Sequence, residues 1–318
     1  MSIRFRFHPI PGFFARREPI IERDGVWPTR HESDEQQGRE TASHLRSVDS
    51  APATLRRMQD DVLVPFIEAP GSSGIFLDFD GTLSEIVEIP SDARPLAEVK
   101  SLLSVLTKHF DLVAIVSGRS AFELQEWLGD EVEIWGVHGA QRAIGGRVTY
   151  SDWALPHQEL MSVVRTEAEE AVARAALPGV VIEDKGVTVG LHFRAARERD
   201  RARSELDRIA DELARKHGLV RAGGRLTFEL RPPVEFSKAA VVLEQAREHN
   251  LKAALFIGDD RVDLPAFDAL DILAAEGLAT ARIAVSSSEV PAELLERADV
   301  IVEGPSGVVE LLKGLVPS

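Results

Sequence analysis

The chain has 318 residues, of which 44% are hydrophobic and 28% are charged, and its formal net charge is −15 at pH 7. This composition is typical of a globular protein of about two domains and excludes a wholly disordered or fibrous chain. The negative charge matches nucleic acid and anionic membranes poorly, and the chain has neither cysteines nor an apolar stretch long enough to span a membrane. We therefore expect a cytoplasmic monomer that acts on a small molecule, without nucleic acid or membrane partners.

The first 70 residues show no sustained hydrophobic periodicity. Residues 31–40 and 47–54 are rich in charged and small polar side chains and hold too few apolar ones to form a core. The segment also lacks the apolar stretch of a signal peptide, and its acidic residues begin too early for a transit peptide. We expect residues 1–70 to form a mobile, disordered leader.

From residue 74 onward, short apolar stretches end abruptly in polar residues and alternate with helical patterns. These stretches predict buried strands at residues 75–80, 112–119, 253–260, 282–287 and 299–304. Continuous apolar strands that alternate with helices indicate a parallel sheet that is covered on both faces. We expect a Rossmann-like α/β core made of residues 71–135 and 234–318.

The pattern between these two parts of the core is different. Residues 158–176 and 198–216 have helical patterns, whereas residues 187–194 and 226–230 alternate between apolar and polar side chains. The alternation predicts an antiparallel sheet with one face under helices and one polar face free. We expect residues 136–233 to form an α+β cap domain inserted into the core.

Polar side chains end three of the predicted core strands: Asp78 and Asp80 end the first, Ser117 the second, and Asp259 and Asp260 another. In open parallel sheets, ligands bind outside the carboxyl ends of the strands, so we expect these side chains to line one crevice. Carboxylates that lie close together need a cation between them, and a set of oxygen ligands suits Mg²⁺ best. The sequence therefore predicts a magnesium site.

Three motifs stand in a characteristic order. The stretch DFDGTLSEI at residues 78–86, SGR at residues 117–119 and GDDRVD at residues 258–263 resemble the signature of the haloacid dehalogenase-like phosphohydrolase superfamily. The resemblance extends over about residues 74–310. It implies a parallel-sheet core of the haloacid dehalogenase-like type and a phosphohydrolase activity.

The resemblance also implies roles for the acidic residues. Asp78 matches the nucleophile that forms an aspartyl-phosphate, and Asp80 matches the residue that protonates the leaving oxygen and later activates water. Mg²⁺ would then be held by Asp78, the backbone carbonyl of Asp80 and Asp259. Asp260 and Asp263 could touch the metal or only support its ligands, and the sequence leaves both possibilities open.

The phosphoryl group needs positive charge and hydrogen-bond donors. Ser117 and its neighbours Gly118 and Arg119 can hold a phosphoryl oxygen. Our candidate for the catalytic lysine is Lys238, which begins an apparent helix after Ser237. The dipole at a helix start disfavours a cation, so a purely structural role explains this lysine poorly.

The predicted cap suggests the substrate. Residues 136–140, 183–194 and 225–229 are similar to stretches of the trehalose-6-phosphate phosphatase family. The resemblance implies that the disaccharide is bound by Glu183, Lys185, Arg194, Arg225 and Glu229. We also expect Gly118, Arg119 and His138 among the substrate-binding residues. The expected function is a Mg²⁺-dependent phosphatase that converts trehalose 6-phosphate to trehalose and phosphate.

Simpler interpretations remain for several of these residues. Ser117 could cap a helix, and His138 could be a structural histidine. The polar face that carries Arg194, Arg225 and Glu229 could be no more than a solvated sheet surface. The chain also departs from the family pattern at Arg225, Ala239, Val262 and Leu264.

Two other functions stay open at this point. The substrate could be another sugar phosphate, such as sucrose 6-phosphate or a phosphorylated glycoside of glycerate. The chain could also be a catalytically silent partner of a synthase that binds the ligand without turning it over. An enzyme is favoured by the presence of Asp78, Asp80, Lys238 and Asp259, because a silent member could have lost any of them.

Overall fold

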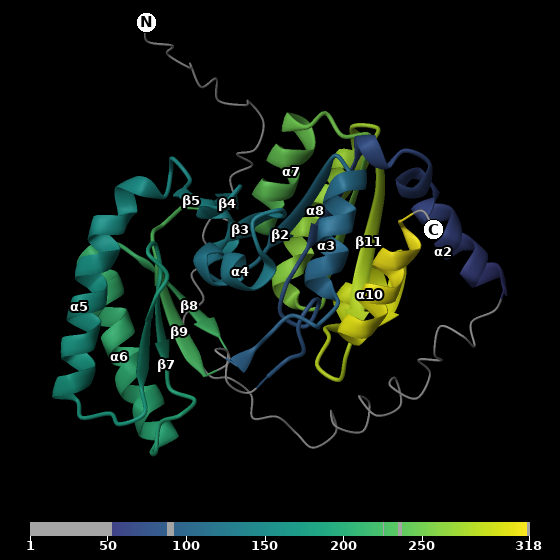
Figure 1. Ribbon diagram of the computed structural model, residues 1–318. Helices are drawn as coiled ribbons and strands as arrows, with labels where there is room; N and C mark the ends of the chain where they lie inside the picture. The colour runs from purple at the N-terminus through teal and green to yellow at the C-terminus, as the bar shows by residue number, and fades with distance from the viewer. Residues whose placement is uncertain (1–52, 88–91, 225, 235–236, 317–318) are drawn as a thin grey trace, which may run out of the picture. The chain divides into compact units, whose positions relative to one another are not determined.

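A computed structural model describes residues 53–87, 92–224, 226–234 and 237–316 (Figure 1). Its main element is an eight-stranded sheet, here called the large sheet, with the strand order β12-β11-β10-β1-β2-β3-β4-β5. The six strands from β12 to β3 run parallel, and β4 and β5 are antiparallel to their neighbours. The strands are β1 (Ser73–Leu77), β2 (Leu112–Val116), β3 (Glu133–Gly136), β4 (Gln141–Ile144), β5 (Arg147–Tyr150), β10 (Ala253–Gly258), β11 (Ala279–Ser286) and β12 (Val300–Glu303).

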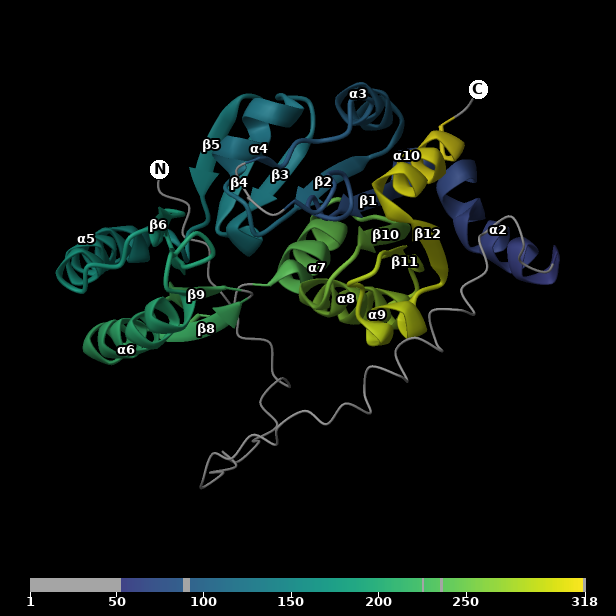
Figure 2. The ribbon, with the colours of Figure 1, turned by 90° about the horizontal axis from the view of Figure 1, so that it is seen from below.

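Helices cover both faces of the large sheet (Figure 2). Alternate residues of a strand point to opposite faces, so Ile75 and Leu77 pack on one side while Phe76 packs on the other. The first face carries α3 (Val99–His109), α4 (Ala121–Leu128) and α10 (Gly304–Gly314), and the second carries α7 (Lys238–Glu248), α8 (Leu264–Ala275) and α9 (Ala292–Arg297). The predicted parallel α/β core is confirmed.

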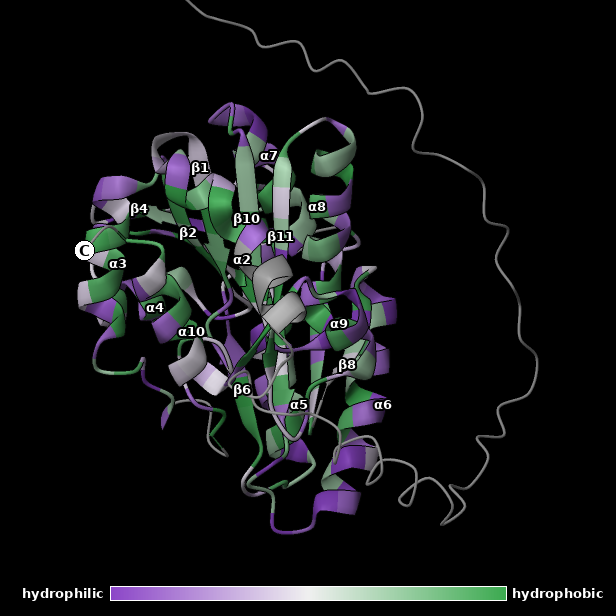
Figure 3. Ribbon diagram, turned by 90° about the vertical axis from the view of Figure 1, so that its right-hand side faces the viewer, coloured by the Kyte–Doolittle hydropathy of each residue, from purple (hydrophilic) through white to green (hydrophobic). Residues whose placement is uncertain are grey.

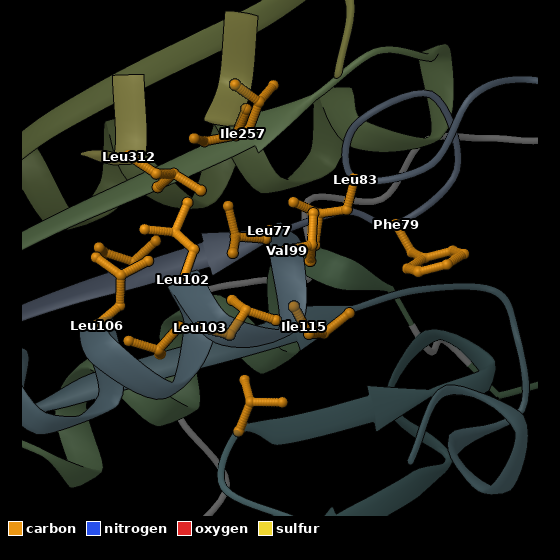
Figure 4. Close-up of a cluster of buried hydrophobic side chains, with 14 of the residues drawn as sticks. Leu77, Phe79, Leu83, Val99, Leu102, Leu103, Leu106, Ile115, Ile257 and Leu312 are labelled. Carbon is orange, nitrogen blue, oxygen red and sulfur yellow. The ribbon is translucent and has the colours of Figure 1, made fainter. Parts of the chain in front are cut away.

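The core of the first face lies between β1 and α3. Leu77 and Ile115 project from the strands toward Leu103 and Leu106 of the helix, and Leu312 of α10 joins them (Figure 4). All five side chains are almost fully buried. Every residue of β1 is buried, so the packing on this strand holds its carboxyl end in place.

Part of the expected leader is folded. Residues 1–52 lie outside the described residues, but Ala53–Glu68 form helix α2, so the predicted disorder up to residue 70 was wrong for this segment. Phe66 is fully buried and packs, with Val62 and Leu63, against the first face of the large sheet. The helical signal was missed because this apolar cluster is short and Pro65 stands inside it.

A second, four-stranded sheet, here called the small sheet, has the order β6-β7-β9-β8 and is antiparallel throughout. Helices α5 and α6 cover one of its faces, where Val189, Leu191, Phe228 and Leu230 are buried. Helix α6 keeps hydrophilic residues on much of its outer surface (Figure 3). This confirms the predicted antiparallel sheet, whose elements are β6 (Val181–Asp184), β7 (Val189–His192), β8 (Val220–Gly224), β9 (Thr227–Arg231), α5 (Gln158–Arg174) and α6 (Arg199–His217).

The change from one sheet to the other comes later than expected. The predicted cap begins at residue 136, but β4 and β5 pair with β3 and so belong to the large sheet. The chain turns back at Gly145 and Gly146, which both have positive φ, and this tight turn keeps β5 beside β4. Sheet membership therefore changes after Tyr150. No helix among the described residues combines the length and the hydropathy that a membrane crossing needs.

Candidate active site

The carboxyl ends of β10, β1 and β2 lie side by side in the large sheet and carry the predicted polar residues. Asp259 follows β10, Asp78 follows β1 and Ser117 follows β2, and all three side chains are buried. The chain runs from β1 to β2 on one side and returns with β10 on the other, so the sheet order switches at β1, where open sheets bind ligands. A cavity of about 510 Å³ lies there, lined by Asp78, Asp80, Ile86, Val87, Ser117, Gly118, His138, Arg194, Lys238, Asp259, Asp260, Val262 and Glu289.

Lys238, the first residue of α7, is buried beneath this cavity with 1% of its surface exposed. Its Nζ lies 2.6 Å from Oδ1 of Asp78 and 2.7 Å from Oδ1 of Asp263. Burial alone would lower the pKa of Lys238, but the two carboxylates raise it above its ordinary value. The ion pairs thus explain why a cation stands at the unfavourable end of a helix.

Asp263 holds residues that line the cavity without lining it itself. Its second oxygen, Oδ2, accepts hydrogen bonds from the backbone amides of Asp259 (3.0 Å) and Asp260 (3.1 Å). The side chain is fully buried and does not line the cavity. Asp263 therefore ties the end of β10 to the start of α7 through Lys238.

The acidic side chains crowd together. One carboxylate oxygen from each of Asp78, Asp259 and Asp263 lies within 4.8 Å of the other two. Burial, together with the negative charge of Asp263, raises the pKa of Asp78 to about 7, against the opposing effect of Lys238. Burial and the charges of Asp78 and Asp263 raise the pKa of Asp259 to about 8. Burial and then mutual repulsion thus raise the pKa of both carboxyl groups. A divalent cation suits such oxygen donors, because its charge would offset the repulsion.

The carboxylate of Asp80 has a different partner. Arg119 binds it with two parallel contacts, Nε to Oδ2 and Nη2 to Oδ1, both 2.8 Å, and also contacts Glu123 at 3.2 Å. The guanidinium lies over the rings of Phe79 and Trp127. The sequence placed Arg119 in the phosphate site, but this contact with Asp80 was not predicted, because it joins two loops 39 residues apart.

Ser117 and His138 also line the cavity. The backbone amide of His138 donates to the carbonyl of Ser117 (2.9 Å), and a side chain at Gly118 would lie 2.9 Å from the His138 ring. Burial and then the positive charges of Lys238, Lys185 and Arg231 lower the pKa of His138 to about 3. His138 therefore stays neutral at the pH of most cells.

The low pKa of His138 predicts a pH-dependent stability. In the unfolded chain this histidine has its ordinary pKa of about 6.5. Below that pH the unfolded state therefore binds a proton that the folded state does not bind, and the free energy of unfolding should fall as the pH drops below about 6.5. Between pH 7 and pH 4.5 we expect this residue to cost about 2 kcal/mol of unfolding free energy. The variant His138→Asn, which tolerates the positive φ at this position, should lose that part of the pH dependence in urea unfolding. The exposed His109→Asn is the matched control; equal acid sensitivity of His138→Asn and wild type would contradict the prediction.

The other predicted residues of the substrate site gather on the small sheet. Glu183 and Glu229 stand in one row across β6, β7 and β9, with Gly190 between them. The Nζ of Lys185 lies 3.6 Å from Glu183 and 3.7 Å from Glu229. These three side chains do not line the 510 Å³ cavity. Of the predicted sugar-binding residues of the small-sheet region, Arg194 lines the cavity, whereas Arg225 lies outside the described residues.

His192 was not singled out from the sequence. Its Nε2 is 2.8 Å from Oε2 of Glu183, and the alternation in residues 187–194 already places it on the polar face. Burial alone would raise the pKa of Glu183, but the hydrogen bond with His192 and the charge of Lys185 lower it overall. Glu183 is thus held as a carboxylate with a fixed orientation, which suits the binding of hydroxyl groups.

Comparison with known proteins agrees with this geometry. The trehalose-phosphatase family model matches residues 76–299. A trehalose-phosphate phosphatase from Mycobacterium marinum is 33% identical over 209 residues, which cover 62% of this chain and 51% of that protein, so the chain spans about half the length of this relative. The crystal structure of a trehalose-6-phosphate phosphatase related protein matches with 28% identity and a TM-score of 0.62, and the match covers 76% of this chain and 96% of that one. A haloacid dehalogenase-like hydrolase from Bacteroides thetaiotaomicron matches in fold, with 16% identity and a TM-score of 0.54 over 76% of this chain and 99% of that one.

The switch in strand order at β1, the buried carboxylates at the strand ends and the second sheet placed between β5 and β10 define a class of protein. The fold is that of the haloacid dehalogenase-like hydrolases. Within this class the family match covers more than half of the sequence, from residue 76 to residue 299. The chain belongs to the trehalose-phosphatase family.

Proposed function

We propose that the protein is a Mg²⁺-dependent phosphatase that hydrolyses trehalose 6-phosphate to trehalose and phosphate. This proposal rests on the position of Asp78. Its side chain lines the cavity at the end of β1, with Lys238 and Asp259 beside it. Family membership and the matches to trehalose-phosphate phosphatases support the choice of substrate.

Two steps account for the reaction. A carboxylate oxygen of Asp78 attacks phosphorus in line, the ester P–O bond breaks, and the sugar oxygen takes a proton from Asp80. Asp80 then accepts a proton from water as that water attacks the aspartyl-phosphate, which releases phosphate and restores Asp78. A protonated Asp80 loses its charge and one of the two oxygens that accept from Arg119, so the two-point ion pair must change during the cycle.

Asp78 and Asp259, with the backbone carbonyl of Asp80, are the residues that would hold Mg²⁺. When bound, the cation would neutralise charge on the phosphoryl oxygens. The role of Asp263, which the sequence left open, is better explained as support, because both of its oxygens already accept hydrogen bonds from Lys238 and from the amides that follow β10. Lys238 would keep Asp78 ionised and oriented for attack.

The proposal is tested by phosphate release from a panel of esters: trehalose 6-phosphate, sucrose 6-phosphate, glucose 6-phosphate and a phosphorylated glycoside of glycerate. We expect trehalose 6-phosphate to have the highest kcat/KM, and EDTA to abolish turnover until Mg²⁺ is restored. A preference for another ester would contradict trehalose 6-phosphate as the substrate, and full activity in EDTA would contradict the dependence on Mg²⁺. Saturable binding without turnover would instead favour the silent regulatory alternative.

Gly81 lies so close to Asp259 that this position has no room for a side chain. Its φ is +74°, and a Cβ at this position would lie 2.0 Å from Oδ2 of Asp259. We expect Gly81→Ala to push the Asp259 carboxylate out of place and to weaken Mg²⁺ binding, measured by calorimetry, by at least about tenfold. Gly71→Ala, where no atom lies within 4 Å of the added Cβ, is the matched control. Unchanged Mg²⁺ affinity in Gly81→Ala would count against Asp259 as a ligand.

A further inference from the structure

Gln141, the first residue of β4, connects loops of the two sheets through its side chain. It is buried, with 1% of its surface exposed. Its Oε1 accepts hydrogen bonds from the backbone amide of Ala121 (2.8 Å) and from Oγ of Ser120 (3.1 Å). Its Nε2 donates to the backbone carbonyl of Lys185 (3.2 Å) and lies 3.4 Å from the hydroxyl of Tyr150.

The first partner, Ala121, lies two residues after the loop of residues 117–119, of which Ser117 and Gly118 line the cavity. The same loop is held on its other side by backbone hydrogen bonds, from Val137 to the carbonyl of Arg119 (2.8 Å) and from His138 to the carbonyl of Ser117 (2.9 Å). The loop is therefore fixed to the segment that joins β3 to β4. Gln141 completes this attachment at the start of α4.

The second partner, Lys185, lies in the turn between β6 and β7. The turn is tight, because the amide of Lys185 donates to the carbonyl of Thr188 (3.1 Å) and the amide of Gly186 to the side chain of Asp184 (2.7 Å). Val187 packs against Val137 and other apolar residues of the large-sheet side. A shift of the Lys185 carbonyl would thus move the whole turn, together with the ammonium group that lies between Glu183 and Glu229.

We propose that Gln141 is a positioning residue that sets the place of Lys185 relative to the loop of residues 117–119, here called the phosphate-holding loop, and so contributes to recognition of the sugar part of the substrate. This inference rests on the proposed function. A glutamine suits the task because it offers an acceptor to the Ala121 side and a donor to the Lys185 side, and the two ends of one planar amide cannot move independently. Loss of the donor alone should loosen sugar recognition while the phosphate-holding loop stays in place.

The decisive variant is Gln141→Glu. A carboxylate keeps an acceptor for Ala121 and Ser120 but turns an oxygen, instead of an amide, toward the Lys185 carbonyl. We expect KM for trehalose 6-phosphate to rise about three- to tenfold, as for the loss of one hydrogen bond, while kcat/KM for the sugar-free ester p-nitrophenyl phosphate stays within about twofold. Tyr150→Phe removes only the longer contact of Nε2 and is the matched control, expected to stay within about twofold on both substrates.

A double variant tests whether Gln141 acts through Lys185. In a Lys185→Ala background, where the ammonium group is absent, Gln141→Glu should raise KM by less than about twofold further. If Gln141→Glu does not fold by circular dichroism, Gln141→Met, which lacks both polar ends, is compared in the wild-type and Lys185→Ala backgrounds instead. For Gln141→Glu, an equal loss on both substrates would overturn the role of Gln141. For either variant, so would an undiminished effect on KM for trehalose 6-phosphate in the Lys185→Ala background.

The outcome for Gln141 is separable from that of the proposed function. A wild-type protein that shows no preference for trehalose 6-phosphate contradicts the proposed function. The KM comparison is then made with the preferred sugar phosphate of the panel, and the role of Gln141 stands or fails on that comparison.

Discussion

Replacement of Asp78 by asparagine is expected to lower phosphate release from trehalose 6-phosphate by at least about three orders of magnitude, because the amide oxygen cannot form the aspartyl-phosphate. The substitution keeps the size of the side chain and removes one of three crowded carboxylates. Burial and repulsion already raise the pKa of Asp78 to about 7, so loss of its charge should not unfold the protein. Steady-state kinetics together with a thermal melt would separate loss of chemistry from loss of fold.

The control for this variant is Asp152→Asn, a change at an exposed aspartate, which should leave kcat/KM within about twofold of wild type. Acid-quenched wild-type enzyme should yield a phosphorylated peptide that contains Asp78, detected by mass spectrometry, and the Asp78→Asn protein should not. Activity of Asp78→Asn within tenfold of wild type would rule out the nucleophilic role.

The second large effect is expected on stability. In Lys238→Met the buried carboxylates of Asp78 and Asp263 lose their common partner, and we expect the free energy of unfolding in EDTA to fall by about 3–5 kcal/mol. Urea unfolding at pH 7 measures this loss. The same variant should also lose most of its phosphatase activity, because nothing then orients Asp78.

Two comparisons test the cause of the loss in Lys238→Met. Lys313→Met, which breaks the exposed pairs with Glu98 and Glu310, should leave the free energy of unfolding almost unchanged. In the double variant Lys238→Met with Asp263→Asn, the free energy of unfolding should fall by less than the sum of the losses in the two single variants. The reason is that the double variant no longer buries the Asp263 carboxylate without its Lys238 partner. Additive losses would show that the three side chains are not coupled.

The parts of the site that could be predicted from the sequence are those with a local signal. Asp78, Ser117 and Asp259 each end an apolar stretch, and parallel strands place such ends along one edge of the sheet. Lys238 could be predicted as a functional lysine because a cation is unfavourable at a helix start. Its pairing with Asp263 could not be predicted, because it depends on how α7 packs beside the end of β10.

Contacts between distant loops carried no such signal. The ion pair of Asp80 with Arg119 and the hydrogen bond of Gln141 with Lys185 join segments 39 and 44 residues apart, and only the folded backbone brings them together. For a related reason, the predicted cap begins at residue 136 and so includes the hairpin of β4 and β5, which belongs to the large sheet. An alternating antiparallel pattern looks the same whichever sheet the strands join, so the pairing with β3 decides it.

Asp263 shows how strictly a residue outside the cavity is constrained. Both of its oxygens accept hydrogen bonds, one from an ammonium group and the other from two backbone amides. Asparagine would turn an NH₂ group toward one of these donors, and glutamate would be too long for a side chain with no exposed surface. In a saturation mutagenesis experiment this position should therefore tolerate as few alternatives as the reacting aspartates, although it lies behind them.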